Sequence, residues 1–374
     1  MTGRSNVPAL AAGTAELDAA IAAAEESAIV VWRGERIPFA DLPAHIARTD
    51  ERSEREGLYA GWIEALEALN PSYRRRYEAW RERAAARMPD AEALALELEQ
   101  LIILSETVYY AALRRYLALI GIEQGDATLA DLWHVERGSA WSHWFDERDL
   151  DRAAGEAGRG STGITHGNGW RSGASALGGS ESVTHGPSAA VGELFRSLVG
   201  DPSWLGSALR MATEEIATFS DFVAFIRLWR LRRCVAQLQY EMRLYATDDE
   251  SVQRAYYSGI VGHTTGVSVP EAAYLHAVGT PFSSVADLER VMLAAAMAER
   301  LESHYGAEWW AKNDARALTD GLANASSTED ALAQLGYDAL DWRPVLRQIR
   351  TRLIGEMSGY GGPNITTRAG TRKV

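Results

Sequence analysis

The sequence predicts a mainly α protein, folded as one large helical domain or two lobes, with at most a small β-hairpin. Apolar residues recur at helical spacing along most of its 374 residues. Only residues 29–39 (IVVWRGERIPF) place β-branched and aromatic residues on both sides of a Gly-containing turn. We therefore expect a single hairpin there, and helices elsewhere.

In the N-terminal part we expect helices over 14–27, 52–69 and 91–120. Asn70-Pro71 predicts the end of the second of these helices, although Pro71 also suits the first turn of a following helix. The segment 129–150 is rich in Trp and His. We expect Trp133, Trp141, Trp144 and Phe145 to pack between helices, with His134 and His143 as partly buried polar partners.

In the C-terminal part, a helix resumes at 189–199, and Asp201-Pro202 ends it and starts another. A long apolar stripe predicts a helix from Phe219 towards Tyr245. A further helix carries Leu288 and Met292, with Ser284 and Asp287 at the spacing of a capping box. The last predicted helices cover 328–335 and 344–357.

A Gly/Ser-rich segment interrupts this helical pattern. It predicts an N-terminal helical lobe over 1–154, a loop over 155–188, a C-terminal helical lobe over 189–358 and a flexible tail over 359–374.

Composition excludes several classes of function. The net charge of −13 argues against nucleic acid as a partner, because neutralising phosphates requires a basic surface. The single cysteine, Cys234, excludes an internal disulfide and a thiolate zinc cluster, and its helical context favours a buried, inert thiol. No signal peptide or membrane-spanning run is evident, so we expect a cytoplasmic protein without a membrane partner.

Several segments resemble a family of mostly helical zinc metallopeptidases, the angiotensin-converting-enzyme-like and thimet-oligopeptidase-like gluzincins, and in particular a bacterial branch of them. The resemblance covers most of the chain. It implies a two-lobed helical bundle around a cleft. It rests on WRGERIPFADLPAHIARTDERSERE, ATLADLWHVERGSAWSHWF, DPSWL, RLWRLRRCVAQLQYEMRLY, PFSSVADLERVMLAAAMAERLESHYGAEWW and AQLGYDALDW.

The family's catalytic residues are degenerate here. Such peptidases bind zinc through HExxH and a Glu on a later helix. The corresponding stretch is HGNGW, in which His166 matches the first ligand, Gly167 replaces the general base and Trp170 replaces the second histidine. Ala189 stands where the third ligand is expected, and Ser283 and Asp287 stand where tyrosines are expected.

One imidazole in place of three ligands does not hold zinc, and loss of the general base removes the peptidase mechanism. Glycines at 167 and 169 also cost about 1 kcal/mol each inside a helix. The sequence therefore predicts no cofactor. Zinc would return only through new ligands, for which His166, His185, Glu181 and Glu193 are the candidates.

The ancestral cleft offers a second set of candidates, in a helical stripe and in the loop-flanked stretch around GHTTG. Ordinary core packing explains Trp229 and Tyr240 equally well. The candidate cleft residues are His185, Glu193, Trp229, Arg233, Tyr240, Tyr256, Tyr257 and His263.

Three hypotheses of function follow. The first is a catalytically degenerate peptidase-like protein, a pseudoenzyme that binds a peptide, a protein or a small ligand in a remodelled cleft. The second is a metal-independent enzyme that reuses the cleft for other chemistry, as in specialised metabolism. The third is an active metallopeptidase with unusual ligands.

Overall fold

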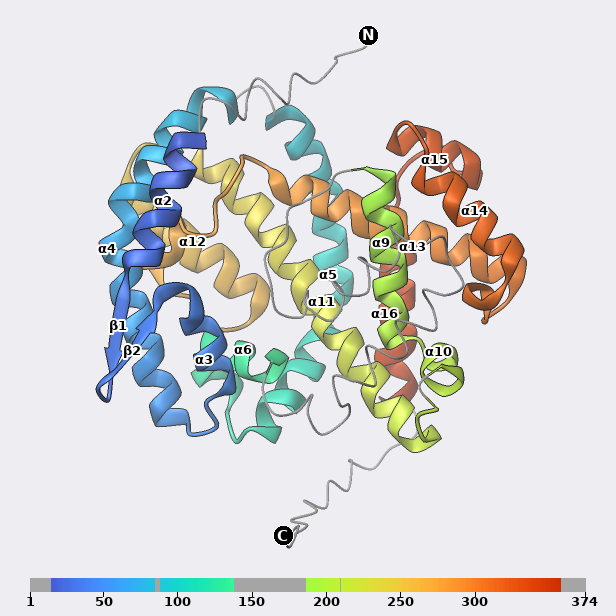
Figure 1. Cartoon of the computed structure of the whole chain (residues 1–374), viewed down its shortest axis with the longest axis horizontal. Helices are drawn as coiled ribbons and strands as arrows, with labels where there is room; N and C mark the ends of the chain where they lie inside the picture. The colour runs from blue at the N-terminus through green and yellow to red at the C-terminus, as the bar shows by residue number, and fades with distance from the viewer. Residues whose placement is uncertain (1–14, 85–87, 138–185, 209, 358–374) are drawn as a thin grey trace, which may run out of the picture.

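The computed structural model describes residues 15–84, 88–137, 186–208 and 210–357, and in these ranges the protein is mainly α, as predicted (Figure 1). Short 3₁₀ turns join several of the helices. The helices are α2 (Ala15–Ser27), α3 (Leu42–Arg48), α4 (Arg52–Ala84), α5 (Met88–Leu119), α6 (Leu129–Arg137), α9 (Pro187–Ser197), α10 (Pro202–Ser207), α11 (Thr213–Leu244), α12 (Glu250–Thr265), α13 (Ser283–Tyr305), α14 (Asn313–Ala323), α15 (Thr328–Leu335) and α16 (Arg343–Met357).

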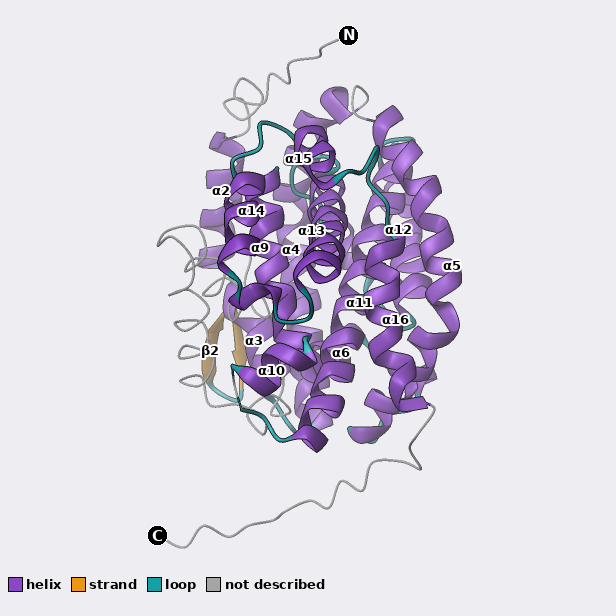
Figure 2. Ribbon diagram, turned by 90° about the vertical axis from the view of Figure 1, so that its right-hand side faces the viewer, coloured by secondary structure: helices purple, strands orange, loops and turns teal. Residues whose placement is uncertain are grey.

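The predicted hairpin is confirmed as the one sheet of the described ranges, with β1 (Ile29–Trp32) antiparallel to β2 (Glu35–Pro38), as Figure 2 shows. Arg33 and Gly34 form its turn with φ values of 51° and 86°. A two-residue turn with two positive φ values matches the twist of the strands. A Cβ atom on Gly57 of α4 would lie 2.0 Å from the Trp32 ring, so a glycine lets the hairpin pack closely on α4.

The predicted helix end at Asn70-Pro71 is wrong, since α4 continues through Pro71 to Ala84. Pro71 removes one backbone donor from the helix. Buried side chains on both sides of it, Leu66, Tyr73 and Tyr77, keep the same face of α4 against the core. The Asn70 side chain donates to the Ala272 carbonyl at 3.1 Å, which ties the same turn to a distant segment. Tertiary packing therefore overrides the local helix-breaking signal.

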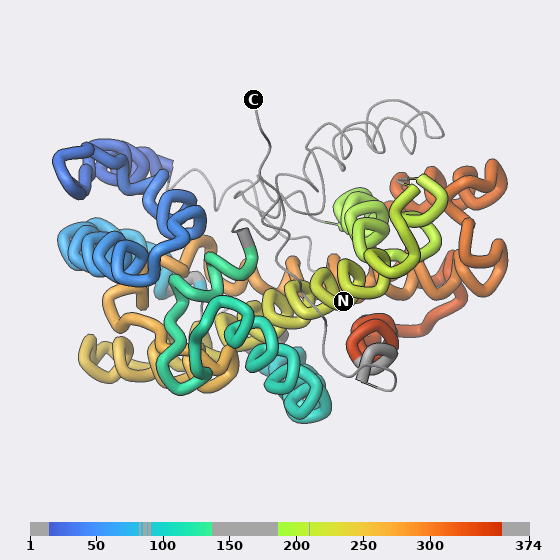
Figure 3. Tube along the Cα trace, turned by 90° about the horizontal axis from the view of Figure 1, so that it is seen from below, coloured from blue at the N-terminus to red at the C-terminus, as the bar shows by residue number. Residues whose placement is uncertain are grey.

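Helix α11 crosses between two groups of helices (Figure 3). The buried apolar residues form two hydrophobic cores. The larger core combines α4, α5 and α6 with most of α11, while the smaller one combines α9, α10, α14 and α15. Both cores take residues from α11 and α13. Phe225 of α11 belongs to the larger core and Phe219 to the smaller one. These two helices therefore connect the cores.

The predicted capping box at the start of α13 is wrong. Ser284 lies inside the helix and is buried, and its hydroxyl has no hydrogen-bond partner among the described residues. The residue before the helix is Phe282, in the left-handed conformation with a φ of 57°. Its backbone N–H donates to the Glu241 carboxylate of α11. A carboxylate from another helix thus takes the place of a local cap.

Three predictions concern residues outside the described ranges. The described ranges leave out residues 155–185 of the predicted loop and the whole tail 359–374. They also leave out four residues of the predicted aromatic layer, Trp141, His143, Trp144 and Phe145. The lobe boundaries at 154 and 189 therefore stay predictions. Within the described ranges, no helix has the length and apolar character needed to cross a membrane.

Candidate functional site

Three of the degenerate zinc positions lie outside the described residues, namely His166, Gly167 and Trp170. Glu181 and His185, two candidate ligands of a new metal site, also lie outside them. Ala189 is described, on the first turn of α9, and its methyl group offers no metal ligand. Glu193 lies on the same helix. Its carboxylate is engaged by Arg196 and lies 3.9 Å from Arg290. Within the described ranges, no three His, Cys, Asp or Glu side chains form a group that could hold a metal ion.

Four of the predicted cleft residues lie near one another on helices α11 and α12. They are Trp229, Arg233, Tyr240 and Tyr257. Trp229, Arg233 and Tyr240 are spaced four and seven residues apart on α11, which puts them on one face of the helix. The Arg233 guanidinium lies 6.0 Å from the centre of the Trp229 ring. Tyr257 of α12 meets the Tyr240 ring edge-on, at 5.0 Å between centroids.

His276, which follows the 3₁₀ turn Glu271–Tyr274, lies beside these residues and was not predicted. Three rings surround its imidazole edge-on, at centroid distances of 5.7 Å from Phe39, 5.8 Å from Trp62 and 5.7 Å from Tyr73. The Arg233 charge acts on both His276 and Tyr257. We call Trp229, Arg233, Tyr240, Tyr257 and His276 together the Arg233 site.

The electrostatics of the Arg233 site keep its histidine and tyrosines neutral at pH 7. Burial, with the nearby charges of Arg233 and Arg76, lowers the pKa of His276 to about 4. Burial raises the pKa of Tyr257, which the Arg233 charge partly opposes, and burial likewise raises the pKa of Tyr240. Arg233 is therefore the one charged group among the five residues.

Buried donors without acceptors lie at the edge of this site. Within the described ranges, the indole Nε1 of Trp229 and that of Trp62 have no hydrogen-bond partner, and neither has the Tyr59 hydroxyl. Trp62 stacks on Tyr59 at 5.6 Å, and the Tyr257 hydroxyl group contributes to the raised pKa of Tyr59. Buried polar groups are nearly always paired in folded proteins. Three donors without a described partner therefore lie around the aromatic residues of this site.

The other two predicted cleft residues lie elsewhere. Tyr256 and His263 lie on helix α12, and both are exposed. The carbonyl of His263 accepts a hydrogen bond from the Tyr110 hydroxyl at 2.7 Å. Nothing in the described ranges joins either side chain to Arg233.

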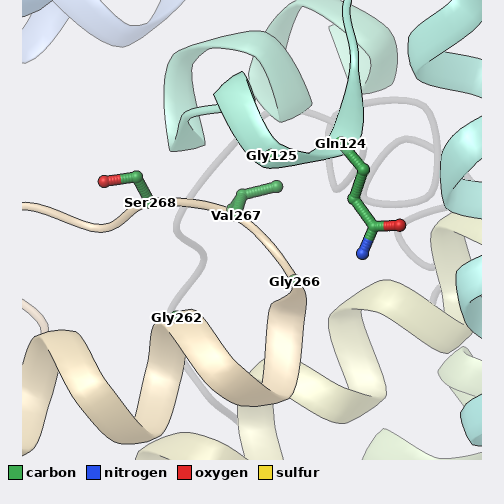
Figure 4. Close-up of a pocket in the computed structure, with 6 residues that line it drawn as sticks. All are labelled: Gln124, Gly125, Gly262, Gly266, Val267 and Ser268. Atoms are coloured by element: carbon green, nitrogen blue, oxygen red, sulfur yellow. The ribbon is translucent and has the colours of Figure 1, made fainter.

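A surface hollow of about 400 Å³ lies beside His263, between the 3₁₀ turn Gln124–Asp126 and the C-terminal end of α12 (Figure 4). Glycines and short side chains line it, and the Gln124 side chain extends over it. Gly266 has a φ of +72°, and a Cβ atom there would lie 2.6 Å from the Tyr110 ring. No titratable side chain lines the hollow, so it is a weaker candidate than the Arg233 site. Its lining residues are Gln124, Gly125, Gly262, Gly266, Val267 and Ser268.

Sequence reasoning missed His276, Tyr59 and Trp62. The helical spacing of α11 signals Trp229, Arg233 and Tyr240, whereas His276 stands alone between a short 3₁₀ turn and α13. No motif marks it. Its neighbours Trp62 and Phe39 come from segments far away along the chain, so only the tertiary structure brings them together.

Comparison with known proteins does not assign this chain to a family. No family model matches the chain, and no curated protein matches it. The likeness to helical zinc peptidases therefore rests on the sequence segments alone.

Proposed function

We propose that this chain is a binding protein whose ligand carries a carboxylate and an apolar body, such as the end of a peptide, and occupies the Arg233 site. The proposal includes descent from helical zinc peptidases with loss of the metal site. One observation carries it. The Arg233 guanidinium is exposed, has no ion pair within the described part of the chain, and lies against an indole ring.

A guanidinium in this position matches a carboxylate ligand. It presents a planar fork of N–H donors that pairs with both oxygens of a carboxylate. Trp229 restricts the guanidinium from one side, so less side-chain entropy is lost when a ligand binds. The Arg233 charge acts on His276, whose partly buried ring offers apolar contact area for the body of the ligand, while Tyr257 is only 3% exposed and supports the site from below the surface.

The unpaired donors at the edge of the site favour a ligand with further acceptors. Each buried donor without an acceptor costs about 1–3 kcal/mol. A ligand carbonyl, or an ordered water that the ligand holds, would pair with the Trp229 indole or the Tyr59 hydroxyl and offset this cost. A peptide end has both a carboxylate and backbone carbonyls, which is the reason for preferring a peptide among carboxylate ligands.

Binding agrees better than acid–base catalysis with the protonation states of the site. A general acid or base works best with a pKa close to the working pH. The pKa of His276 is lowered to about 4, and those of Tyr240 and Tyr257 are raised above their usual range. These groups are therefore poor proton shuttles at pH 7, although they remain good hydrogen-bonding and apolar contacts.

A metal-independent enzyme that reuses the cleft is the second candidate, and His276 favours it. No described residue forms a hydrogen bond with the His276 imidazole, so its neutral ring can accept a hydrogen bond from a bound ligand and orient it, although its lowered pKa makes it a weak base. In that case, His276→Gln would abolish turnover and leave binding intact. If His276→Gln changes only affinity, the binding proposal stands alone.

Two compounds that differ only in their charge test the proposal, N-acetylphenylalanine and N-acetylphenylalaninamide. We expect calorimetry to show the acid binding at least about tenfold more tightly than the amide, because only the acid pairs with Arg233. The Arg233→Gln variant should lose this preference. Equal affinities for the acid and the amide, or an unchanged preference in Arg233→Gln, would overturn the proposal.

Arg243→Gln is the matched control. Arg243 is exposed near the end of the same helix and has no ion pair within the described part of the chain. Its replacement removes the same net charge. The control should therefore retain the preference for the acid, which separates a local contact at Arg233 from an effect of overall charge.

A further inference from the structure

A second group of arginines lies beside the middle of α11, where four helices contribute one arginine each. Arg196 comes from α9, Arg227 from α11, Arg290 from α13 and Arg352 from α16. We call these four residues the Arg227 cluster. Arg196 and Arg290 both contact Glu193, and the charges of Glu193 and Arg352 both act on Arg227. The four guanidinium groups therefore share one neighbourhood.

The carboxylates of this neighbourhood are engaged by three of the arginines. Glu193 pairs with Arg196, Asp287 lies 2.8 Å from Arg290, and Asp201 lies 3.5 Å from Arg352. The charges of Asp201 and Arg352 also act on Glu302. Partial burial and the Asp201 charge raise the pKa of Glu302, and the Arg352 charge partly opposes this. Arg227 has no carboxylate within 4.0 Å and no hydrogen bond in the described ranges. Burial and the Arg352 charge lower the pKa of Arg227 to about 10.

Every arginine of the Arg227 cluster has a buried nitrogen without a hydrogen bond in the described ranges, although Nε of Arg290 lies 3.9 Å from the Glu193 carboxylate. These atoms are Nε of Arg196, Nη1 of Arg227, Nε of Arg290 and Nη1 of Arg352. Buried donors are nearly always paired in folded proteins, so four such cationic donors from four helices favour an acceptor beyond the described residues. All four atoms are N–H donors of positively charged guanidinium groups, so the missing partner in each case is a hydrogen-bond acceptor.

The backbone here also approaches the arginines closely. A Cβ atom on Gly200 would lie 3.2 Å from Nη1 of Arg352 and 2.7 Å from a methyl group of Val223. The side chains of Arg196 and Arg290 remain 24% and 22% exposed, so solutes can reach the cluster from solution.

From these observations we infer that the Arg227 cluster is a binding site for a phosphate-class anion, either free phosphate or the phosphoryl group of a monoester. A tetrahedral anion has acceptor oxygens in several directions, which suits donors that come from four helices. Guanidinium groups also match phosphate geometry with two parallel hydrogen bonds. A carboxylate ligand fits less well, because its two oxygens lie in one plane. The Arg227 cluster shares no residue with the Arg233 site, so the inference does not depend on the proposed function.

Inorganic phosphate and phenyl phosphate are the probes, with potassium chloride at matched ionic strength as the reference. We expect phosphate to raise the melting temperature by roughly 2–4 °C more than chloride does, because it binds the folded state. Tighter binding of phenyl phosphate than of phosphate would identify a monoester as the ligand, and the reverse would identify free phosphate. An equal shift with chloride would overturn the inference.

Arg227→Gln tests the central residue, and Arg243→Gln is the matched control on the same helix. The first variant should bind phosphate at least about tenfold more weakly in calorimetry, and the second should bind as the unmodified protein does. Arg227→Lys, which keeps the charge without the fork, guards against a folding defect and should bind with intermediate affinity. Unchanged phosphate binding in a folded Arg227→Gln protein would overturn the inference.

Discussion

Arg232 and Arg227 lie five residues apart on α11, yet the protein satisfies the guanidinium of one and leaves that of the other without acceptors in the described ranges. Arg232 is 2% exposed and donates to the carbonyls of Thr264 and Ile102, at 2.8 Å and 2.9 Å. It also donates to the Ser105 hydroxyl at 2.9 Å, and it lies 4.4 Å from the centre of the Tyr109 ring. Arg227 has no such set of acceptors among the described residues.

The difference separates a structural cation from cations that can take a ligand. Arg232 joins α11 to α5 and to the end of α12, and its hydrogen bonds compensate for its burial. Arg227 and Arg233 lie on other faces of the same helix and lack acceptors in the described part of the protein. Burial of an arginine is therefore a poor guide to its role. The presence or absence of acceptors for its donors is the better guide.

Replacing Arg232 should have the largest effect on stability. Arg232→Met removes three hydrogen bonds, to the carbonyls of Thr264 and Ile102 and to the Ser105 hydroxyl, so we expect the free energy of unfolding to fall by about 2–4 kcal/mol. Urea unfolding followed by circular dichroism measures this change. Arg227→Met is the comparison, and it should change stability by less than about 1 kcal/mol, because no hydrogen bond to a described residue is lost. Equal losses in the two variants would break the distinction between these arginines.

The pH dependence of stability reports on His276 at the Arg233 site. Its pKa is lowered to about 4 in the folded protein. An unfolded chain therefore takes up a proton as the pH falls through about 6.5, while the folded protein does not until about 4. The stabilisation is complete above pH 6.5 and is lost over this window, by about 1–3 kcal/mol.

A His276→Gln variant should lose that part of the pH dependence. His134, whose pKa burial also lowers, remains in the variant and keeps its own, separate contribution. Unfolding curves collected between pH 4 and pH 7 make the comparison. If the two proteins have the same dependence on pH, then folding does not lower the pKa of His276.

Replacing Arg233 should have a smaller effect. Arg233→Gln removes a contact with one indole ring and no ion pair to a described residue, so stability should change by less than about 0.5 kcal/mol. The midpoint of urea unfolding measures this. A loss as large as that in Arg232→Met would show that Arg233 is structural, which would weaken the case for a ligand there.

The sequence predicted local structure well where short-range chemistry decides it. Arg33-Gly34 sets the hairpin turn, and Asp201 caps α10 through a hydrogen bond from the Trp204 backbone N–H, at the place where Asp201-Pro202 predicted a helix start. Prediction from the sequence failed where residues distant along the chain determine the local structure. Pro71 does not end α4, because the core holds both halves of the helix, and the cap of α13 comes from Glu241 on another helix.

The same reason explains which parts of the candidate site were predictable. Trp229, Arg233 and Tyr240 share a helix face, so their spacing in the sequence is enough to group them. His276 and the unpaired donors of Tyr59 and Trp62 join them only through contacts between α4, the 3₁₀ turn Glu271–Tyr274 and α11. Whether a donor has an acceptor is a property of the packed structure, which a single sequence does not show.

Cys234, next to Arg233 in the chain, gives the smallest expected effect and a check on the local electrostatics. Burial, with the charge of Asp287, raises the pKa of its thiol. Because the thiolate is the reactive form, a disulfide reagent at pH 8 should modify Cys234 at least about a hundredfold more slowly than a free thiol. Denaturant should restore the full rate.

The control is Ser303→Cys in a Cys234→Ala background, since Ser303 is exposed on α13. That thiol should react at the rate of a free cysteine. Rapid modification of Cys234 in the folded protein would mean that Arg233 and its neighbours stabilise a thiolate. The positive charge of Arg233, which we propose to bind a ligand carboxylate, would then act on the Cys234 sulfur instead.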